Sequence, residues 1–329
     1  MIVAHPLGIG LIGVGRHGSR YVRHLLHDMP DASLVAICRK RTGERAEELS
    51  LPSIPVYGDY RALIADPLVQ AVIVVTPPTL CREICLEAVR VGKPLLIEKP
   101  LAPTAHEARE MVRAADQGRV LLMTAHTLRF DSAIEEVKNT LPQLGVLRSA
   151  AMTSHIEFSS STLATTEAFG RRGALLEVGI HLLDAVRYLT GDEVREVRCH
   201  MEPVPPPGPE AKAVVELTTV KGVACRLDIA RVAAERIACM EWIGSEGRVT
   251  ADWHQHRLTK QDRSGNRKEW TVKPWPTILS VLRGFVHAVR TDSCPPVTGK
   301  DGQKAVEIAE ACYRSAELGG QLVEVESDN

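Results

Sequence analysis

Three ionisable side chains of this sequence stand in contexts suited to proton transfer. Lys99 follows the apolar segment Pro94–Ile97, so it is predicted at the carboxyl end of a buried strand. An ammonium group there can lower the pKa of a substrate hydroxyl or stabilise a developing alkoxide. Glu177 and His181 share one face of the strongly apolar helix predicted for Ala174–Leu189, and histidine suits proton exchange near neutral pH. From the sequence, the Glu177–His181 pair fits a catalytic role and a buried structural role equally well.

A glycine-rich segment lies between a predicted strand, Ile9–Gly13, and a predicted helix, Ser19–Met29. Gly13 permits a tight turn, Gly15 lets the backbone approach a pyrophosphate, and Gly18 lets the helix pack closely on the strand. The helix N-terminus offers N–H groups and partial positive charge to phosphates. Because this GxGxxG spacing has the required strand–turn–helix context, we predict a dinucleotide-binding loop. Its predicted cofactor contacts are Gly13, Val14, Gly15, Arg16, His17 and Gly18.

The end of the second predicted strand, Leu34–Cys38, bears on the choice of cofactor. An acid near this position usually holds the ribose 2′-hydroxyl of NAD. Here Cys38 is followed by three basic residues beginning at Arg39, and no carboxylate occurs before Glu44. The small Cys38 leaves room, and a guanidinium can stack on adenine and pair with a 2′-phosphate. We therefore predict NADP(H) in preference to NAD(H); the alternative interpretation is a solvated basic turn.

The first third of the chain alternates short β-branched runs with amphipathic helices. The continuous apolar run Ala71–Val75 is typical of a central parallel strand that is covered on both faces. Alternation at this spacing predicts βαβ units and a doubly wound parallel sheet. Ligands of such sheets bind at the carboxyl ends of the strands. We therefore predict further cofactor contacts at Thr76, Pro77, Glu98 and Lys99.

The pattern changes after about residue 130. From Val194 to Val272 the chain consists of successive β-like runs without a helical period, which predicts a mainly antiparallel sheet. Helices are predicted for Ile278–Arg290 and Gly302–Leu318. We predict two domains: an α/β domain over residues 1–127, and an α+β domain with a large open sheet over residues 128–329.

Composition excludes several other classes of protein. The 329 residues include 40 basic and 41 acidic side chains, so the net charge of −1 gives no global attraction to nucleic acid or to an anionic membrane. Aromatic residues make up only 4%, which disfavours a base-stacking surface. No apolar run approaches the roughly 20 residues needed to span a bilayer. Eight cysteines without a CxxC pair, and no secretory signal, predict reduced thiols and a cytoplasmic location.

Four ordered motifs together resemble the glucose-fructose oxidoreductase / inositol dehydrogenase (Gfo/Idh/MocA) family. They are GVGRHG, TPPTLCREICLEAVRVGKPLLIEKPLA, ALLEVGIHLLDAVRYLTG and GQKAVEIAEACYRSAELGG, and the resemblance covers nearly the whole chain. It implies an N-terminal Rossmann domain and a C-terminal α/β domain with an open sheet. It also implies NAD(P)-dependent oxidation or reduction, usually of sugars and cyclitols. With the long run of strands, it predicts a homodimer or homotetramer.

The resemblance implies roles for individual residues. The lysine of the family's EKP motif falls on Lys99, and the histidine of its acid-x-Gly-x-His pattern falls on His181. The acid of that pattern is usually aspartate, and here it is Glu177. Cys81 stands where the family usually has histidine, and Arg39 replaces the usual acid after the second strand. These departures point towards NADP-linked relatives.

We therefore predict an NADP(H)-dependent oxidoreductase acting on one C–OH or C=O carbon of a sugar, cyclitol or related polyol, without a metal. In this hypothesis His181 exchanges the hydroxyl proton, Lys99 stabilises the oxyanion, and Glu177 orients or tunes them. Two alternatives stay open: a non-catalytic nucleotide-sensing regulator, and an enzyme acting on a dihydrodiol, an imine or a tetrapyrrole. Retention of Lys99 and His181 disfavours the regulator. Candidate substrate-side residues, which fit a structural role as well, are His126, Arg129, Arg171, Arg172 and Asp184.

Overall fold

In a computed structural model the chain forms two compact units. The first comprises Met1–Ala125 and Thr277–Gln303, and the second comprises His126–Pro276 and Lys304–Asn329. The sequence-based division at residue 127 assigned residues 277–303 to the second domain, whereas their contacts lie in the first unit. The residues that the structure describes are 5–39, 54–157, 169, 172–203, 208–233 and 235–326.

The first unit is built on a six-stranded sheet in which every pair of neighbouring strands is parallel. The strand order is β3-β2-β1-β4-β5-β6, which confirms the doubly wound fold predicted from the alternating pattern. The order reverses between β1 and β4, so a ligand crevice is expected where these two strands end. The strands are β1 (Leu7–Ile12), β2 (Ala32–Cys38), β3 (Val56–Tyr57), β4 (Ala71–Val74), β5 (Leu95–Glu98) and β6 (Leu122–Ala125).

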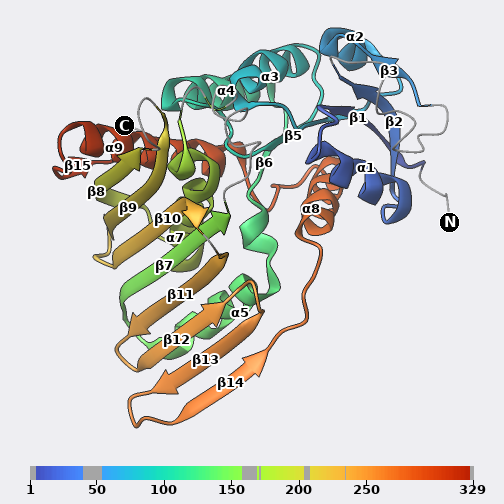
Figure 1. The fold of residues 1–329 in the computed structure, drawn as a ribbon. Helices are drawn as coiled ribbons and strands as arrows, with labels where there is room; N and C mark the ends of the chain where they lie inside the picture. The colour runs from blue at the N-terminus through green and yellow to red at the C-terminus, as the bar shows by residue number, and fades with distance from the viewer. Residues whose placement is uncertain are drawn as a thin grey trace. The chain divides into compact units, whose positions relative to one another are not determined.

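Helices cover both faces of this sheet, with α1 and α8 on one side and α2, α3 and α4 on the other (Figure 1). Local caps fix where they begin: Thr104 accepts the N–H of Glu107 at the start of α4, and Asp59 accepts the N–H of Arg61 at the start of α2. The elements are α1 (Gly18–His27), α2 (Tyr60–Ala65), η1 (Pro78–Leu80), α3 (Cys81–Arg90), α4 (Ala105–Gly118) and α8 (Thr277–Thr291). Residues 40–53, which follow β2, lie outside the described residues.

The apolar face of α8 explains why the chain returns to the first unit. Ile278, Leu282 and Phe285 are almost completely buried, and α8 contacts α1. The guanidinium of Arg290 donates hydrogen bonds to backbone oxygens at residues 5 and 31 (3.3 and 3.0 Å). An amphipathic pattern predicts that a helix buries one face, but it does not tell which sheet receives that face.

The second unit is built on a nine-stranded sheet of order β14-β13-β12-β11-β7-β10-β9-β8-β15. All neighbouring strands are antiparallel except β7 and β10, which confirms the predicted mainly antiparallel sheet. The strands are β7 (Leu147–Glu157), β8 (Val194–Pro203), β9 (Glu210–Thr219), β10 (Ala224–Ala233), β11 (Ile237–Gly244), β12 (Gly247–Asp252), β13 (Arg257–Asp262), β14 (Arg267–Thr271) and β15 (Val323–Glu324).

One face of this sheet packs against helices. In Figure 1, α5 and α7 lie behind the sheet, and contacts join α5 to β12 and β13, α7 to β7, and η4 to β9 and β10. The helical elements of the unit are η2 (Thr127–Phe130), α5 (Ser132–Thr140), η3 (Leu141–Leu144), the π-helical turn η4 (Leu175–Gly179), α7 (Ile180–Thr190) and α9 (Gly299–Glu317), which starts in the first unit. Among the described residues, no helix is both long and apolar enough to cross a membrane.

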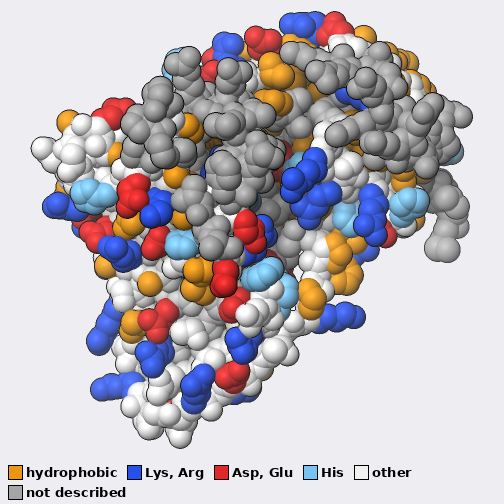
Figure 2. All heavy atoms as spheres, viewed as in Figure 1, with side chains coloured by type: hydrophobic (Ala, Val, Ile, Leu, Met, Phe, Trp, Pro, Cys, Tyr) orange, Lys and Arg blue, Asp and Glu red, His pale blue; other side chains and the backbone are white. Residues whose placement is uncertain are grey.

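The opposite face of the nine-stranded sheet carries no helix among the described residues (Figure 1). Over β11–β14, Figure 2 shows charged side chains of both signs scattered among white atoms, which are the backbone and the uncharged polar side chains. A shallow groove on the face is lined by residues that include Thr153, Glu241, Thr250, Arg257, Arg267 and Glu269. Within the described part of the chain, helices therefore cover only one face of this sheet, in agreement with the predicted open sheet.

Candidate functional site

The glycine loop joins β1 to α1 at the carboxyl edge of the first sheet. Gly13 has a positive φ of 95° and donates its N–H to the carbonyl of Cys38 (3.0 Å). A Cβ on Gly13 would collide with the backbone oxygen of Val75, and a Cβ on Gly18 would collide with that of Gly13. At Gly15, by contrast, a Cβ would meet no atom of the described residues within 4 Å. The fold itself requires Gly13 and Gly18, whereas Gly15 leaves open space beside the loop.

This open loop fits the pyrophosphate of a dinucleotide. Gly15, Arg16 and His17 are exposed, and Val14 is buried beneath them. In the part of the chain that the structure describes, no side chain caps the start of α1. The first turn of the helix therefore presents N–H groups and the positive end of the helix dipole to an anion. Arg16 adds a positive charge to the same loop. The residues present thus agree with the phosphate-binding part of a nicotinamide cofactor.

Cys38 and Arg39 lie directly beside the glycine loop. The carbonyl of Cys38 accepts the N–H of Gly13, and the N–H of Arg39 bonds to the carbonyl of Tyr57 (3.1 Å). Cys38 is buried, and this burial, with a smaller contribution from the charge of Asp59, raises the pKa of its thiol to about 11. Cys38 is therefore a small neutral side chain at the strand end, and Arg39 is half-buried next to it.

Glu98 joins the glycine loop to the strand end that carries Lys99. Its Oε1 lies 2.8 Å from His17 Nε2 and accepts the hydroxyl of Tyr21 (2.5 Å), while its Oε2 accepts the N–H of Lys99 (3.1 Å). Burial would raise the pKa of Glu98, but His17, the charge of Lys99 and the Tyr21 hydroxyl together lower this pKa below its usual range. Burial, followed by the charge of Glu98, raises the pKa of Tyr21 well above its usual value. Glu98 is thus a buried carboxylate with three donors around it.

Lys99 and Thr76 follow the neighbouring strands β5 and β4 at the same edge of the sheet. The peptide bond between Lys99 and Pro100 is cis. After β4, the Thr76 hydroxyl lies 3.7 Å from the thiol of Cys81, whose Sγ donates to the carbonyl of Pro77. Burial raises the pKa of Cys81 to about 12, so this residue is a buried neutral thiol at the start of α3.

The sequence predicted that Glu177 and His181 lie in one regular α-helix of the second unit. The structure instead places them in two different elements. Glu177 lies in the π-helical turn η4, and His181 lies in the first turn of α7. A π turn holds an extra residue, so the i, i+4, i+7 spacing of Glu177, His181 and Asp184 does not place all three on one face. The carboxylate of Glu177 forms an ion pair with Arg231 on β10. Asp184 has a different partner, Arg129, which lies in η2.

Four of the predicted side chains, those of His126, Arg129, His181 and Asp184, form one cluster in the second unit. Arg129 donates two hydrogen bonds to its carboxylate (2.8 and 2.6 Å), and both residues are at least nine-tenths buried. The Nδ1 atom of the fully buried His126 lies 3.8 Å from Asp184 Oδ2. The ring of His126 stands edge-on to the ring of His181, with 6.3 Å between their centroids. Because Arg129 and Asp184 satisfy one another in a bidentate pair, this geometry favours a supporting role for them behind the two histidines.

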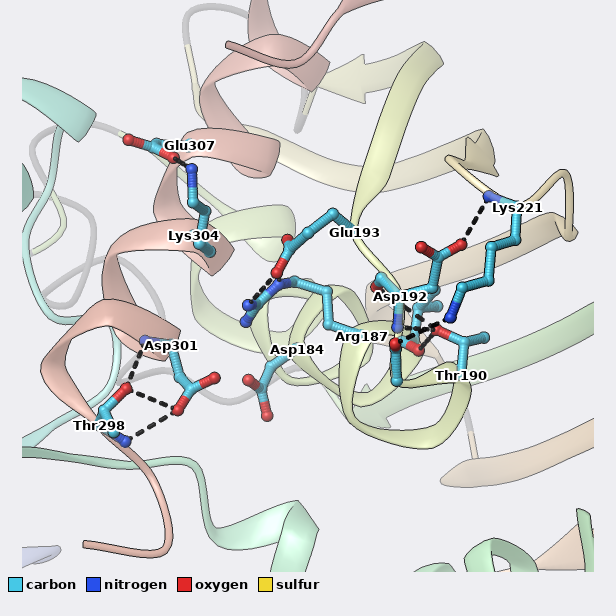
Figure 3. A network of polar contacts seen from close by, with 12 residues as sticks. Asp184, Arg187, Thr190, Asp192, Glu193, Lys221, Thr298, Asp301, Lys304 and Glu307 are labelled. Carbon is cyan, nitrogen blue, oxygen red and sulfur yellow. Dashed lines mark hydrogen bonds and ion pairs between the residues drawn. The ribbon is translucent and has the colours of Figure 1, made fainter. Parts of the chain in front are cut away.

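Other charged residues near α7 have partners of their own. Figure 3 shows Arg187 directed at Glu193 (2.7 Å), while the carboxylate of Asp184 points away from this pair. Arg172 lies over the ring of Tyr313 (4.3 Å) and 3.8 Å from Glu310. Arg171, also predicted on the substrate side, lies outside the described residues.

Several residues of these clusters were not found from the sequence. Tyr21 in the Glu98 cluster reads as an ordinary buried helix residue, and Arg231 as one charge in an alternating strand. Glu210 and Tyr313, which hold the segment before η4, lie far apart in the chain. No local spacing connects these residues with the motifs. The only local sign of an irregular turn was Gly179, because a glycine within an apolar helical pattern weakens the prediction of a regular helix.

Comparison with known protein families agrees with an N-terminal Rossmann domain followed by a second domain. Residues 7–126 match a family model described as an oxidoreductase family with an NAD-binding Rossmann fold. Residues 105–250 match the GFO/IDH/MocA C-terminal domain. The two models together cover most of the chain, and the chain belongs to the GFO/IDH/MocA family of oxidoreductases.

Individual relatives match along nearly the whole chain. Myo-inositol 2-dehydrogenase of Thermotoga maritima is 28% identical over an alignment covering 94% of this chain and 96% of the relative. D-apiose dehydrogenase of Paraburkholderia graminis is 27% identical, covering 96% of this chain and 89% of the relative. The crystal structure of aldose-aldose oxidoreductase from Caulobacter crescentus, complexed with glycerol, superposes with a TM-score of 0.86 at 24% identity, covering 97% of this chain and 100% of that one. This last likeness bears on the fold alone.

Proposed function

We propose that this protein is an NADP(H)-dependent oxidoreductase that acts on one CH–OH or C=O carbon of a sugar, cyclitol or related polyol. The observation that carries the proposal is the glycine loop, which is open at Gly15 and connected through Glu98 to the strand end bearing Lys99. The relatives named for myo-inositol and D-apiose support a polyhydroxylated substrate.

The bound nicotinamide would supply or accept the hydride, and the residues of this chain would handle the charge and the proton. Lys99 is proposed to stabilise negative charge on the substrate oxygen. His181 is proposed to exchange the hydroxyl proton, since its ring is only partly buried while the neighbouring His126 is fully enclosed. The ion pair of Glu177 with Arg231 favours an orienting role for this glutamate over a role as proton acceptor.

Selection of the 2′-phosphorylated cofactor is proposed to rest on Cys38 and Arg39. The small Cys38 side chain occupies the strand end where an acid would repel a 2′-phosphate. Arg39 follows at once, and its guanidinium can pair with that phosphate and stack on the adenine. The location of both residues beside Gly13 supports this proposal.

We further propose that the open face of the nine-stranded sheet binds a second copy of this chain. The face carries Arg257 and Arg267 together with Glu241 and Glu269, so a two-fold axis can bring opposite charges together. We expect a homodimer or homotetramer in sedimentation at micromolar concentration, and Arg267→Glu to shift the protein towards monomer. A monomer of 36.0 kDa as the only species would contradict this proposal.

The function is tested by incubating the protein with panels of sugars and cyclitols, each with NADP⁺ and with NAD⁺, and following formation of the reduced cofactor. We expect turnover with at least one polyol and a higher kcat/KM for NADP⁺. Tight NADPH binding without turnover of any polyol, aldose or ketose would contradict the proposal and would favour a nucleotide-sensing role. Turnover of an imine or a dihydrodiol alone would contradict the substrate class.

A further inference from the structure

The segment that leads into η4 is held by a buried carboxylate on β9. Glu210 Oε1 accepts hydrogen bonds from the backbone N–H groups of Gly173 (2.9 Å) and Leu175 (3.1 Å). The same oxygen accepts the hydroxyl of Tyr313 on α9 (2.6 Å). Burial, and then the charge of Glu210, raises the pKa of Tyr313 well above its usual value, so the phenol stays a donor. Negative charge at the start of a helix is favourable, and Glu210 supplies it here.

An ion pair holds the middle of the same turn from β10. Glu177, the central residue of η4, pairs with Arg231, whose side chain is 7% exposed. A buried guanidinium that loses its counter-charge is strongly destabilising, which favours keeping this pair formed. The turn is therefore attached to two adjacent strands through two different carboxylates.

Close packing adds to these polar attachments. A Cβ on Gly173 would collide with the backbone of Glu210, and a Cβ on Gly179 would lie 2.8 Å from Ile229 Cδ1. The backbone before and at the end of η4 thus rests directly on β9 and β10. The two glycines permit a close approach that no other residue type would allow without a shift of the neighbouring groups.

The π form of this turn determines where α7 points its first side chains. A π turn contains one residue more than the α-helical turn it replaces. Relaxation to a regular α-helix would rotate the residues after the turn by about 100° relative to those before it. His181 is the second residue of α7, so its ring direction depends directly on the state of η4.

We propose that Glu210, Tyr313 and Arg231 are positioning residues that keep η4 in its π form and thereby set the direction of the His181 ring. This inference rests on the proposed function, in which His181 exchanges the substrate proton. None of the three residues is assigned contact with the reacting atoms; each acts through the backbone of η4 or through Glu177. We call them the η4 clamp.

The test compares clamp variants with a matched control on the same strands. Arg231→Met removes the buried charge at similar volume, and Tyr313→Phe removes only a hydroxyl. The control is Arg226→Met, because Arg226 also lies on β10 but is exposed and pairs with Glu216 of β9 (2.7 Å). Each variant is made in the wild-type background and in His181→Ala, and kcat is measured in both. Hydrogen exchange of the peptide over residues 173–181 is measured on the free protein, without substrate or cofactor.

We expect Arg231→Met to lower kcat by about 10- to 100-fold in the wild-type background and to have little further effect in His181→Ala. Exchange of the 173–181 peptide should be faster in both clamp variants and unchanged in Arg226→Met. NADPH affinity should stay the same in all of them. Partial recovery of kcat in Arg231→Lys would support the role of the charge.

Two results would contradict the positioning role proposed for the η4 clamp. One is unchanged exchange in both clamp variants, which needs no substrate and so decides the matter even if the proposed function fails. The other is an equal loss of kcat in the wild-type and His181→Ala backgrounds, because the residues would then act independently of His181. Failure of the proposed function has a different signature: no polyol is turned over although exchange responds as predicted.

Discussion

The glycine loop of the first unit and the π turn of the second are built in different ways. The loop consists of six consecutive residues, and its shape follows from backbone geometry: Gly13 at positive φ, and Gly18 packed on the Gly13 carbonyl. The π turn is held by side chains from β9, β10 and α9, far apart in the chain. The loop can therefore be recognised as a sequence motif, whereas the π turn depends on tertiary contacts. A function that needs both regions therefore depends on a local motif in the first unit and on tertiary contacts in the second.

The largest effects should come from replacing the proposed catalytic group of each unit. Lys99→Ala and His181→Ala should each lower kcat by about 10²–10⁴-fold, since each removes a group that acts on the reacting oxygen. NADPH affinity should change much less. The double variant should lose less than the product of the single losses, because both groups serve one proton transfer.

Steady-state kinetics with the identified polyol measures kcat, and fluorescence titration with NADPH measures the cofactor affinity. Near-normal turnover in His181→Ala would remove the second unit from the proton transfer. Lys99 would then carry this step alone.

The next largest effect concerns the buried pair behind the histidines. Arg129→Met leaves the Asp184 carboxylate buried without its bidentate partner, and we expect a loss of about 3–5 kcal/mol in the free energy of unfolding. Arg226→Met breaks an exposed pair and should cost only about 0–1 kcal/mol. Urea unfolding of the two variants checks the difference. Equal losses would mean that the Arg129–Asp184 pair does not hold the second unit's site together.

A smaller effect is expected for cofactor choice. Arg39→Asp should weaken NADPH binding and improve NADH binding, because it replaces a partner for the 2′-phosphate with an acceptor for the 2′-hydroxyl. A shift of about tenfold in the ratio of dissociation constants corresponds to about 1.4 kcal/mol. Titration of both cofactors measures it. A wild-type protein that prefers NADH would disprove the role given to Arg39.

The smallest effect is a pH dependence from Glu98. The folded protein lowers the pKa of Glu98 below its usual value of about 4.3, so its ionised form stabilises the fold. This contribution is fully present above the unfolded pKa and is lost as the pH falls through the lower folded pKa. The stability advantage of wild type over Glu98→Gln should therefore be constant near neutral pH and shrink below about pH 4. A constant difference down to pH 2 in urea unfolding would contradict this assignment.

The contrast between the two regions also explains what the sequence could predict. The parallel sheet, the glycine loop and the strand end at Lys99 follow from local periodicity and spacing, and the structure has these features. The π turn could not be predicted, since the apolar pattern around Glu177 also fits a regular α-helix. The return of α8 to the first unit was missed because amphipathicity does not specify the partner.

The central claim is that this chain transfers hydride between NADP(H) and a carbinol carbon of a polyol. The most direct measurement uses polyols deuterated at their carbinol carbons, incubated with NADP⁺ and the wild-type protein, with mass spectrometry of the recovered cofactor. We predict one deuterium on the nicotinamide ring, with a rate reduced strongly in both Lys99→Ala and His181→Ala. Absence of deuterium in the cofactor, with every polyol of the panel and with NAD⁺ as well, would contradict the claim.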